Sequence, residues 1–201
     1  MQLRAPAILV AARPHGETAV VARMLTEQNG LVAGYVAGGR GRQLRPVVIP
    51  GNLVEADLRA RSDSQLPFAR LELVTSRGPW LSEPLAAAAI NWTCALTASA
   101  LPERNAYPAL YHALGGLLDA VCGAPSARGW APALVAFESL MLRDLGYGGG
   151  ETRPQVANLS EALEILDLME PQIARNLLAG HQSDVMATRA LLRARLARME
   201  E

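Results

Sequence analysis

The hydrophobic pattern of the chain changes its period near residue 80, and this change most limits the folds that the sequence can adopt. Before it lie short apolar runs separated by glycine- and proline-containing turns. These runs predict strands at Ala7–Arg13, Thr18–Thr26, Leu31–Ala37, Asn52–Ser62 and Phe68–Thr75. After it come alanine- and leucine-rich stretches of helical length. We therefore predict an α+β protein, with a β domain over residues 1–80 and an all-α domain over residues 81–201.

Two local signals sharpen the β prediction. Asn29-Gly30 separates two apolar segments and is a strong hairpin signal, because both residue types tolerate positive φ. In the Asn52–Ser62 segment, charged and apolar residues alternate with period two, which is typical of a strand with one buried face. Five short strands in about eighty residues favour a five-stranded OB-fold barrel, although the pattern alone leaves an SH3-like barrel almost equally favoured.

The second part predicts a series of helices punctuated by proline and glycine. Their expected ranges are Pro84–Leu101, Ala106–Val121, Trp130–Leu145, Leu159–Glu170 and a last helix beginning near Ser183. Asn158 followed by Glu161 resembles a capping box, which predicts a helix start at that point.

Charge is distributed unevenly although the net charge is zero. Residues 1–80 contain ten arginines and six acidic residues, whereas the rest of the chain contains nine arginines and thirteen acidic residues. This asymmetry indicates that the first part meets an anionic partner. All 19 basic residues are arginine, so the chain has no lysine for Schiff-base chemistry or for a phosphate-binding P-loop.

The segment 38–46 (GGRGRQLRP) is the most informative motif. Its glycines allow a backbone to approach a phosphate chain closely, and Arg40, Arg42 and Arg45 offer permanently charged, bidentate phosphate contacts. On an OB-fold, such a loop lies where single-stranded nucleic acid would run. The spacing alone is equally compatible with a solvated connector between two strands.

Further residues of the β domain extend this candidate DNA-binding face. Arg13, Arg59 and Arg61 add positive charge near the loop in the predicted strands. Tyr35 is a candidate platform for stacking a base, although a core position is the simpler interpretation of a tyrosine within a strand. His15 lies in a predicted turn, where we expect it to be exposed to solvent.

Motifs for catalysis or metal binding are not found in the sequence. His15, His112 and His181 are scattered and have no second ligand at metal-binding spacing, and two cysteines are too few for an all-cysteine zinc site. Nucleophile-elbow, dinucleotide-binding and zinc-protease motifs are also missing. We therefore expect a non-enzymatic protein without metal or cofactor. No apolar stretch reaches membrane-spanning length, which favours a cytoplasmic location.

The ordered set of motifs resembles the RecO family, over roughly residues 7–148. In proteins of this family, the first strand leads into a turn with the pattern R-P-aromatic-G-E. Here His15 takes the aromatic position of that turn. The other matching segments are Leu25–Gly30, Gly38–Pro46, Pro50-Gly51, Ala100–Arg104, Tyr107–Tyr111, Phe137-Glu138 and Leu142–Gly148.

This resemblance implies an OB-fold joined to a helical domain, and a protein that binds single- and double-stranded DNA and anneals complementary strands. It also implies action with RecR to load RecA on DNA covered by single-strand-binding protein (SSB), whose acidic C-terminal tail docks on the helical domain. Arg143, Arg189 and Arg193 are our candidates for that docking site.

The chain departs from the family pattern in two places. Many relatives carry a four-cysteine zinc module where this chain has the cysteine-free segment Gly148–Val156, so we expect no zinc. The basic loop contains arginine alone and fewer charges than is usual in the family, so we expect modest affinity for DNA.

Two other functions fit the same features. The first is a protein–protein adaptor that docks RecR and SSB without appreciable DNA affinity. The second is an RNA-binding OB-fold protein, which would prefer RNA through contacts to the 2′-hydroxyl groups.

Overall fold

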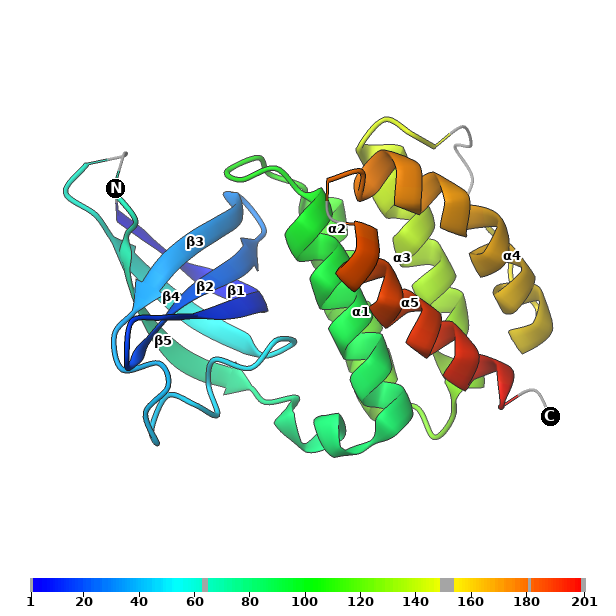
Figure 1. Cartoon of the computed structure of the whole chain (residues 1–201), viewed down its shortest axis with the longest axis horizontal. Helices are drawn as coiled ribbons and strands as arrows, with labels where there is room; N and C mark the ends of the chain where they lie inside the picture. Colours follow the sequence, from blue (N-terminus) through cyan, green and yellow to red (C-terminus); the bar gives the residue numbers. More distant parts are fainter. Residues whose placement is uncertain (1, 63–64, 149–153, 181, 200–201) are drawn as a thin grey trace. The chain divides into compact units, whose positions relative to one another are not determined.

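The first part of the chain folds into a barrel whose strands point alternate, apolar residues inward. The computed structural model describes residues 2–62, 65–148, 154–180 and 182–199. Its strands are β1 (Gln2–His15), β2 (Ala19–Thr26), β3 (Gly30–Val36), β4 (Leu53–Arg59) and β5 (Phe68–Thr75) (Figure 1). They are ordered β1-β2-β3-β5-β4, and β1 pairs with β4 to close the barrel. This is the five-stranded OB-fold arrangement, which rules out the SH3-like alternative.

Strand β1 is longer than the sequence predicts, because it serves two neighbours. Its first half, from Gln2 to Ile8, pairs with β4, and its second half, from Ala7 to His15, pairs with β2. A register shift between Leu9 and Ala11 lies within the second half. Such irregularities bend a strand and increase its twist, which is what a strand wrapping around a small barrel requires.

The barrel core consists of the inward-facing side chains of all five strands, together with Val48 from the segment between β3 and β4. Its buried members are Ala7, Leu9, Val20, Ala22, Met24, Val32, Val36, Val48, Val54, Ala56, Leu58, Ala69 and Leu71. Leu44 and Val47, from the segment between β3 and β4, pack against this core. The segment that carries the predicted basic loop is therefore anchored to the barrel by apolar contacts.

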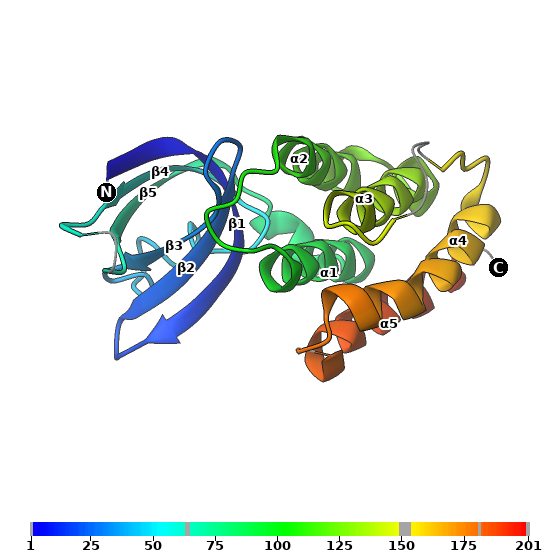
Figure 2. The same cartoon turned by 90° about the horizontal axis from the view of Figure 1, so that it is seen from above.

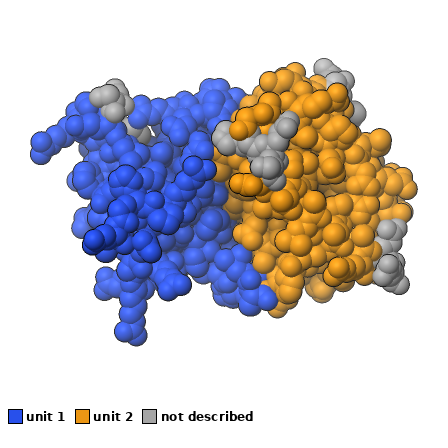
Figure 3. All heavy atoms as spheres, viewed as in Figure 1, with its two compact units in different colours: residues 1–82, 101–111 blue, residues 83–100, 112–201 orange. Residues whose placement is uncertain are grey.

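The hairpin predicted at Asn29-Gly30 joins β2 to β3, and a later segment packs against it. Gly30 has a φ of +64°, and a Cβ at this position would overlap the backbone carbonyl of Asn105. The backbone N–H of Arg104 donates a hydrogen bond of 2.8 Å to the carbonyl of Leu31. Residues 101–111 thus form one compact unit with residues 1–82, and residues 83–100 and 112–201 form a second unit (Figure 3).

Helices make up the second unit. They are α1 (Pro84–Ala100), α2 (Pro108–Gly123, whose first turn belongs to the first unit), α3 (Ala131–Asp144), α4 (Leu159–Gln172) and α5 (Gln182–Ala197). Helix α5 runs along α1 and helix α4 along α3 (Figure 1). Seen from above, α1, α2 and α3 gather in one bundle (Figure 2).

The start and end of α4 follow from individual residues. The Asn158 side chain accepts a hydrogen bond of 2.9 Å from the Glu161 N–H, which confirms the predicted cap. The Glu161 carboxylate in turn accepts one of 2.7 Å from the N–H of Ala157. At the other end, Pro171 has no N–H to donate, and a π-helical turn at Ile173–Leu177 follows the last residue of the helix, Gln172.

Both cysteines lie in helices, with Cys94 buried in α1 and Cys122 half-buried in α2. Within the described ranges, no three His, Cys, Asp or Glu side chains are grouped so that they could hold a metal ion. In the same part of the chain, no helix combines the length and apolar character needed to cross a membrane.

Candidate nucleic-acid interface

Strand pairing aligns predicted DNA-binding residues in one row across the barrel. The register places five residues opposite one another in successive strands: Arg13, Val21, Tyr35, Phe68 and Arg59. Residues directly opposite one another in paired strands point to the same side of the sheet. Because the alternate residues of these strands form the barrel core, the whole row faces outward.

Three aromatic side chains form a contact chain at the centre of this face. The Tyr35 ring lies edge-on to the Phe68 ring at a centroid distance of 5.3 Å, and edge-on to the His15 ring at 5.7 Å. Tyr35 is half-buried, whereas 66% of Phe68 is exposed. The interpretation of Tyr35 as a core residue is therefore wrong, and its outward position fits the alternative of a nucleic-acid contact. His15 is exposed, as predicted.

Phe68 was missed by the sequence reasoning. It is the first residue of a correctly predicted strand, in which Ala69 and Leu71 face inward. The period of two could therefore have placed Phe68 on the outer face. Its alignment with Tyr35 depends on the single parallel pairing of β3 with β5, for which the sequence carries no local signal.

The predicted arginines of β4 and the segment after it differ in their surroundings. Arg59, Arg61 and Phe68 line one depression on the barrel surface. However, the Arg59 guanidinium donates hydrogen bonds of 3.0 and 2.7 Å to the two carboxylate oxygens of Asp57. The hydrogen bond from Arg59 lowers the pKa of Asp57, so this carboxylate stays charged and offsets the positive charge of Arg59. The positive charge of Arg59 is therefore less available to a phosphate.

The structure brings together the three arginines of the predicted basic loop. Arg40, Arg42 and Arg45 are exposed and line one depression. The backbone N–H of Arg40 donates a hydrogen bond of 2.9 Å to the carbonyl of Thr18, and its guanidinium donates one of 3.0 Å to the carbonyl of Glu17. These bonds fix the loop against the turn between β1 and β2, which follows His15 at the end of β1 rather than containing it as the sequence predicted.

A buried asparagine holds the other end of the same loop. The Asn52 side-chain amide donates hydrogen bonds of 3.0 Å to the carbonyls of Pro46 and Val47. Its side-chain oxygen accepts one of 2.8 Å from the N–H of Arg77. Asn52 is fully buried, and its three hydrogen bonds hold the backbone from which the loop arginines extend. The sequence reasoning assigned no role to Asn52.

Several predicted arginines of the barrel remain available to an anion. Arg13, Arg42, Arg45 and Arg61 are exposed, and none of them has a salt-bridge partner among the described residues. Exposed guanidinium groups that have no acidic partner within the described part of one unit contribute positive potential there, and such potential attracts a polyanion.

The prediction that Arg189 binds a partner is wrong, because this side chain is buried. Only 3% of it is exposed, and its guanidinium donates hydrogen bonds of 3.2 and 2.8 Å to the two carboxylate oxygens of Glu138. It also donates to Glu170 and to the carbonyl of Leu166. The Trp92 indole N–H donates a bond of 2.7 Å to the same Glu138 carboxylate. Arg189 therefore joins helices within the core of the second unit.

The Glu138 carboxyl feels opposing influences in this cluster. Desolvation by burial raises its pKa, whereas the charge and hydrogen bonds of Arg189 and the hydrogen bond from Trp92 oppose that rise. Burial is the largest effect, so the net direction is upward.

The two other candidates for partner binding are more accessible. Arg193 donates hydrogen bonds of 2.7 and 2.8 Å to both carboxylate oxygens of Asp167, and this pairing lowers the pKa of Asp167. Arg143 is 44% exposed and bonds to its neighbour Asp144 at 3.2 Å. Arg143 also borders a depression that lies between α2 and α3.

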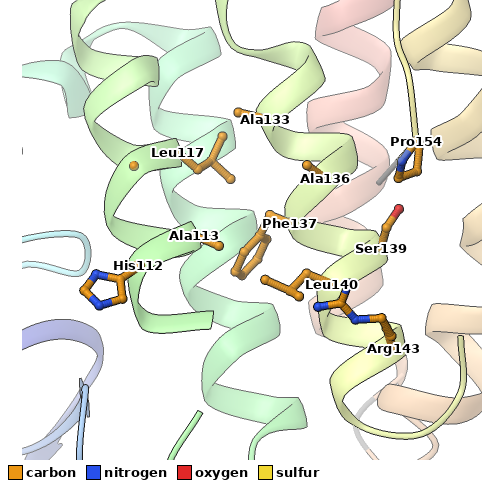
Figure 4. A pocket seen from close by; sticks show the side chains of 11 residues that line it. His112, Ala113, Leu117, Ala133, Ala136, Phe137, Ser139, Leu140, Arg143 and Pro154 are labelled. Carbon is orange, nitrogen blue, oxygen red and sulfur yellow. The ribbon is translucent and has the colours of Figure 1, made fainter. Parts of the chain in front are cut away.

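That depression has an apolar floor and a polar rim. Leu117 and Ala113 reach into it from α2, and Phe137 and Leu140 reach into it from α3 (Figure 4). His112, Ser139 and Arg143 lie around its edge (Figure 4). This combination suits a peptide that has both apolar and acidic side chains.

Comparison with known proteins assigns both units to one family. Residues 1–77 match the family model described as Recombination protein O N terminal, and residues 81–149 match the one described as Recombination protein O C terminal. Proteins named DNA repair protein RecO are similar to most of this chain. The Rhodospirillum centenum protein is 44% identical over 144 residues, which are 71% of this chain and 56% of that protein.

Two further relatives give the same result. The proteins of Gluconacetobacter diazotrophicus and of a Ruegeria species, both also named DNA repair protein RecO, are 38% and 41% identical over 151 and 149 residues. The alignments cover 74% of this chain in both cases, and 59% and 61% of those proteins. The chain thus spans less than two thirds of the length of these relatives. With both family models matched in order over most of its length, the chain belongs to the RecO family.

Proposed function

We propose that this chain is a non-enzymatic DNA-binding protein of recombination and DNA repair, which holds single-stranded DNA on the outer face of its barrel. The observation that carries the proposal is the convergence of Arg40, Arg42 and Arg45 on one exposed loop with an anchored backbone. Guanidinium groups bind phosphates bidentately and keep their charge at any physiological pH. The name DNA repair protein RecO, which the relatives carry, supports the same conclusion.

The proposed cellular role is that of a mediator. Bound to single- or double-stranded DNA, the protein would promote annealing of complementary strands. Together with RecR it would load RecA on DNA covered by SSB. Each of these steps requires handling of the phosphate backbone without sequence preference, which is the kind of binding that a row of arginines provides. Neither a metal nor a cofactor takes part in this scheme.

The proposed docking site for the acidic C-terminal tail of SSB is the depression between α2 and α3. Its apolar floor would take up an apolar side chain of the tail, and Arg143 at its rim would pair with an acidic group. An SSB-tail peptide should therefore bind less tightly to the Arg143→Ala variant. The Arg128→Ala variant is the matched control, because Arg128 is exposed elsewhere in the same unit and does not line this depression.

The test of DNA binding is fluorescence anisotropy of labelled oligo(dT) across a salt series. The variant combines Arg40→Ala, Arg42→Ala and Arg45→Ala. Losing three phosphate contacts should lower the slope of log K against log salt by about two, because each contact to a single strand contributes about 0.7. A control variant loses the same charge from exposed arginines of the second unit, namely Arg128, Arg175 and Arg198.

The possible outcomes separate the proposal from its alternatives. A salt-dependent affinity that falls only in the loop variant supports the proposal. Wild-type protein that binds RecR but not oligo(dT) would favour the adaptor function. Tighter binding to oligo(U) than to oligo(dT) would favour an RNA-binding protein, since the 2′-hydroxyl groups distinguish the two backbones.

A further inference from the structure

We propose that Phe68 is a stacking platform for an unpaired base and makes the barrel surface selective for single-stranded over double-stranded DNA. The proposal rests on the proposed function, because it concerns the same face of the barrel. It goes further in naming a residue that contacts an unpaired base, whereas the arginines contact the charged backbone.

The first observation is the exposure of a large aromatic side chain in an ordered strand. Phe68 is 66% exposed, although a phenylalanine gains most by burial. A single exposed apolar side chain is common on protein surfaces and means little alone. Phe68, however, lies in the outward-facing row with Arg13, Tyr35 and Arg59.

The second observation is that the ring is supported from one side. The edge-on contact with Tyr35 at 5.3 Å, with an interplanar angle of 76°, restricts where the Phe68 ring can lie. Tyr35 is itself in contact with His15, and its backbone N–H donates a hydrogen bond of 2.7 Å to the carbonyl of Pro67. A ring that is held before binding loses little conformational entropy when a base stacks on it.

The third observation is the chemistry around the ring. Arg61 lines one depression together with Phe68, and Leu44 of the basic loop lines another together with Phe68. The second depression also carries the carboxylates of Glu55, Asp57 and Glu72. The positive charge available next to the ring therefore lies on the side of Arg61. A partner that presents a planar apolar group between negatively charged groups matches this arrangement, and single-stranded nucleic acid is such a partner.

The selectivity follows from the state of the bases. In a duplex, each base is stacked between its neighbours, so the ring of Phe68 finds no open base face. In a single strand, a base can turn out of the strand and stack on the ring, and any of the four bases can do so. Phe68 should therefore add affinity for single strands only, while the arginines add affinity for both forms.

The test compares Phe68→Ala with wild type on three labelled ligands. These are oligo(dT), an abasic oligomer of the same length, and a duplex. We expect Phe68→Ala to weaken oligo(dT) binding about tenfold, which corresponds to ~1.4 kcal/mol and lies within the range for base–aromatic stacking. Binding to the abasic oligomer and to the duplex should not change, and the salt slope for oligo(dT) should stay at its wild-type value because no phosphate contact is lost.

Two further variants keep the test independent of folding. Val74→Ala removes another exposed apolar side chain from β5 and should bind all three ligands as wild type does. Phe68→Trp keeps a stacking surface and should retain oligo(dT) affinity. Its additional tryptophan fluorescence should be quenched by oligo(dT) but not by the abasic oligomer.

The outcomes distinguish this inference from the function on which it rests. If wild type binds oligo(dT) with a salt-dependent affinity and Phe68→Ala binds it equally well, the stacking role is refuted and the proposed function stands. Equal losses on oligo(dT), abasic oligomer and duplex would also refute it, since stacking cannot affect the last two. If wild type binds no oligonucleotide at all, the proposed function fails and the stacking role fails with it.

Discussion

Replacing Arg189 by methionine tests how the second unit is held together. The substitution keeps a long, flexible side chain but removes the positive charge that faces Glu138. Glu138 is 1% exposed, so its carboxylate cannot turn to water when its partner is lost. It would keep the hydrogen bond from the Trp92 indole, which is not enough to offset the burial of a full charge.

The size of the effect follows from the burial of both partners. Removing one member of a buried ion pair costs about 3–5 kcal/mol, because the other charge remains buried and uncompensated. The bond to Glu170 adds little, since 53% of that side chain is exposed and water replaces the contact. The total stability of a small domain is ~5–15 kcal/mol, so this single loss would be a large fraction of it.

The double variant Arg189→Met with Glu138→Gln separates the lost pair from the buried charge. A neutral glutamine can still accept the hydrogen bond from Trp92, and it leaves no charge in the core. Exchange of a buried pair for neutral groups is often close to neutral in stability, so the double variant should recover most of the ~3–5 kcal/mol. Urea unfolding followed by the helical circular dichroism signal measures all three proteins.

The pH dependence of Arg189→Met has a definite sign. Burial raises the pKa of Glu138, and the variant lacks the opposing charge of Arg189, so its pKa rises further. A carboxyl with a raised pKa binds its proton more tightly in the folded state. The stability of the variant is therefore highest where Glu138 is protonated and falls as pH rises through the folded pKa, so the loss should be larger at about pH 8 than at about pH 5. A variant within ~1 kcal/mol of wild type, or a loss that shrinks as pH rises, would refute the reasoning.

Three smaller perturbations have equally direct expectations. Asn52→Ala leaves two loop carbonyls and one N–H without their partner and should cost ~1–3 kcal/mol in thermal unfolding, while also weakening oligo(dT) binding by loosening the basic loop. Gly30→Ala should cost several kcal/mol and Gly16→Ala only ~1 kcal/mol, because both have positive φ but only at Gly30 would a Cβ overlap a backbone carbonyl. Asp167→Asn should cost at most ~1 kcal/mol, since both it and Arg193 are partly exposed. Arg193 lowers the pKa of Asp167, so the pair contributes to the free energy of unfolding above the ordinary pKa of 3.8. This contribution is lost as pH falls through the lowered pKa. Acid titration of the stability of wild type and variant measures the loss.

Local patterns predicted the strands and helices where each element carries its own signal. The bounds of Phe68–Thr75 and the start of the first helix at Pro84 agree with the prediction, and the alternation in β4 correctly assigned its buried face. The first half of β1 was missed, because residues 2–6 have only β4 as a partner and the two are far apart in the chain. A strand whose pairing is wholly non-local gives no turn signal that would reveal it.

The candidate interface was predictable only in part, for the same reason. The glycine and arginine spacing of the loop is local, so the sequence alone indicates Arg40, Arg42 and Arg45. The aromatic chain depends instead on β3 meeting β5 at one pair of residues, Tyr35 and Phe68. The closure of the barrel creates this contact, and no window of sequence contains both sides of it.

Contacts between residues far apart in the chain also determine which arginines are available to bind DNA. Arg189 and Glu138 are 51 residues apart in the chain, and only the packed helices show that they neutralise each other. Arg143 and Arg193 also pair with acidic side chains, whereas Arg13, Arg42, Arg45 and Arg61 have no salt-bridge partner among the described residues. A net charge of zero therefore conceals exposed barrel arginines that have no acidic partner among the described residues, whereas all three candidate partner-binding arginines of the second unit are paired. Because phosphate binding releases counterions only where charge is uncompensated, the salt dependence of DNA binding should come from the barrel arginines.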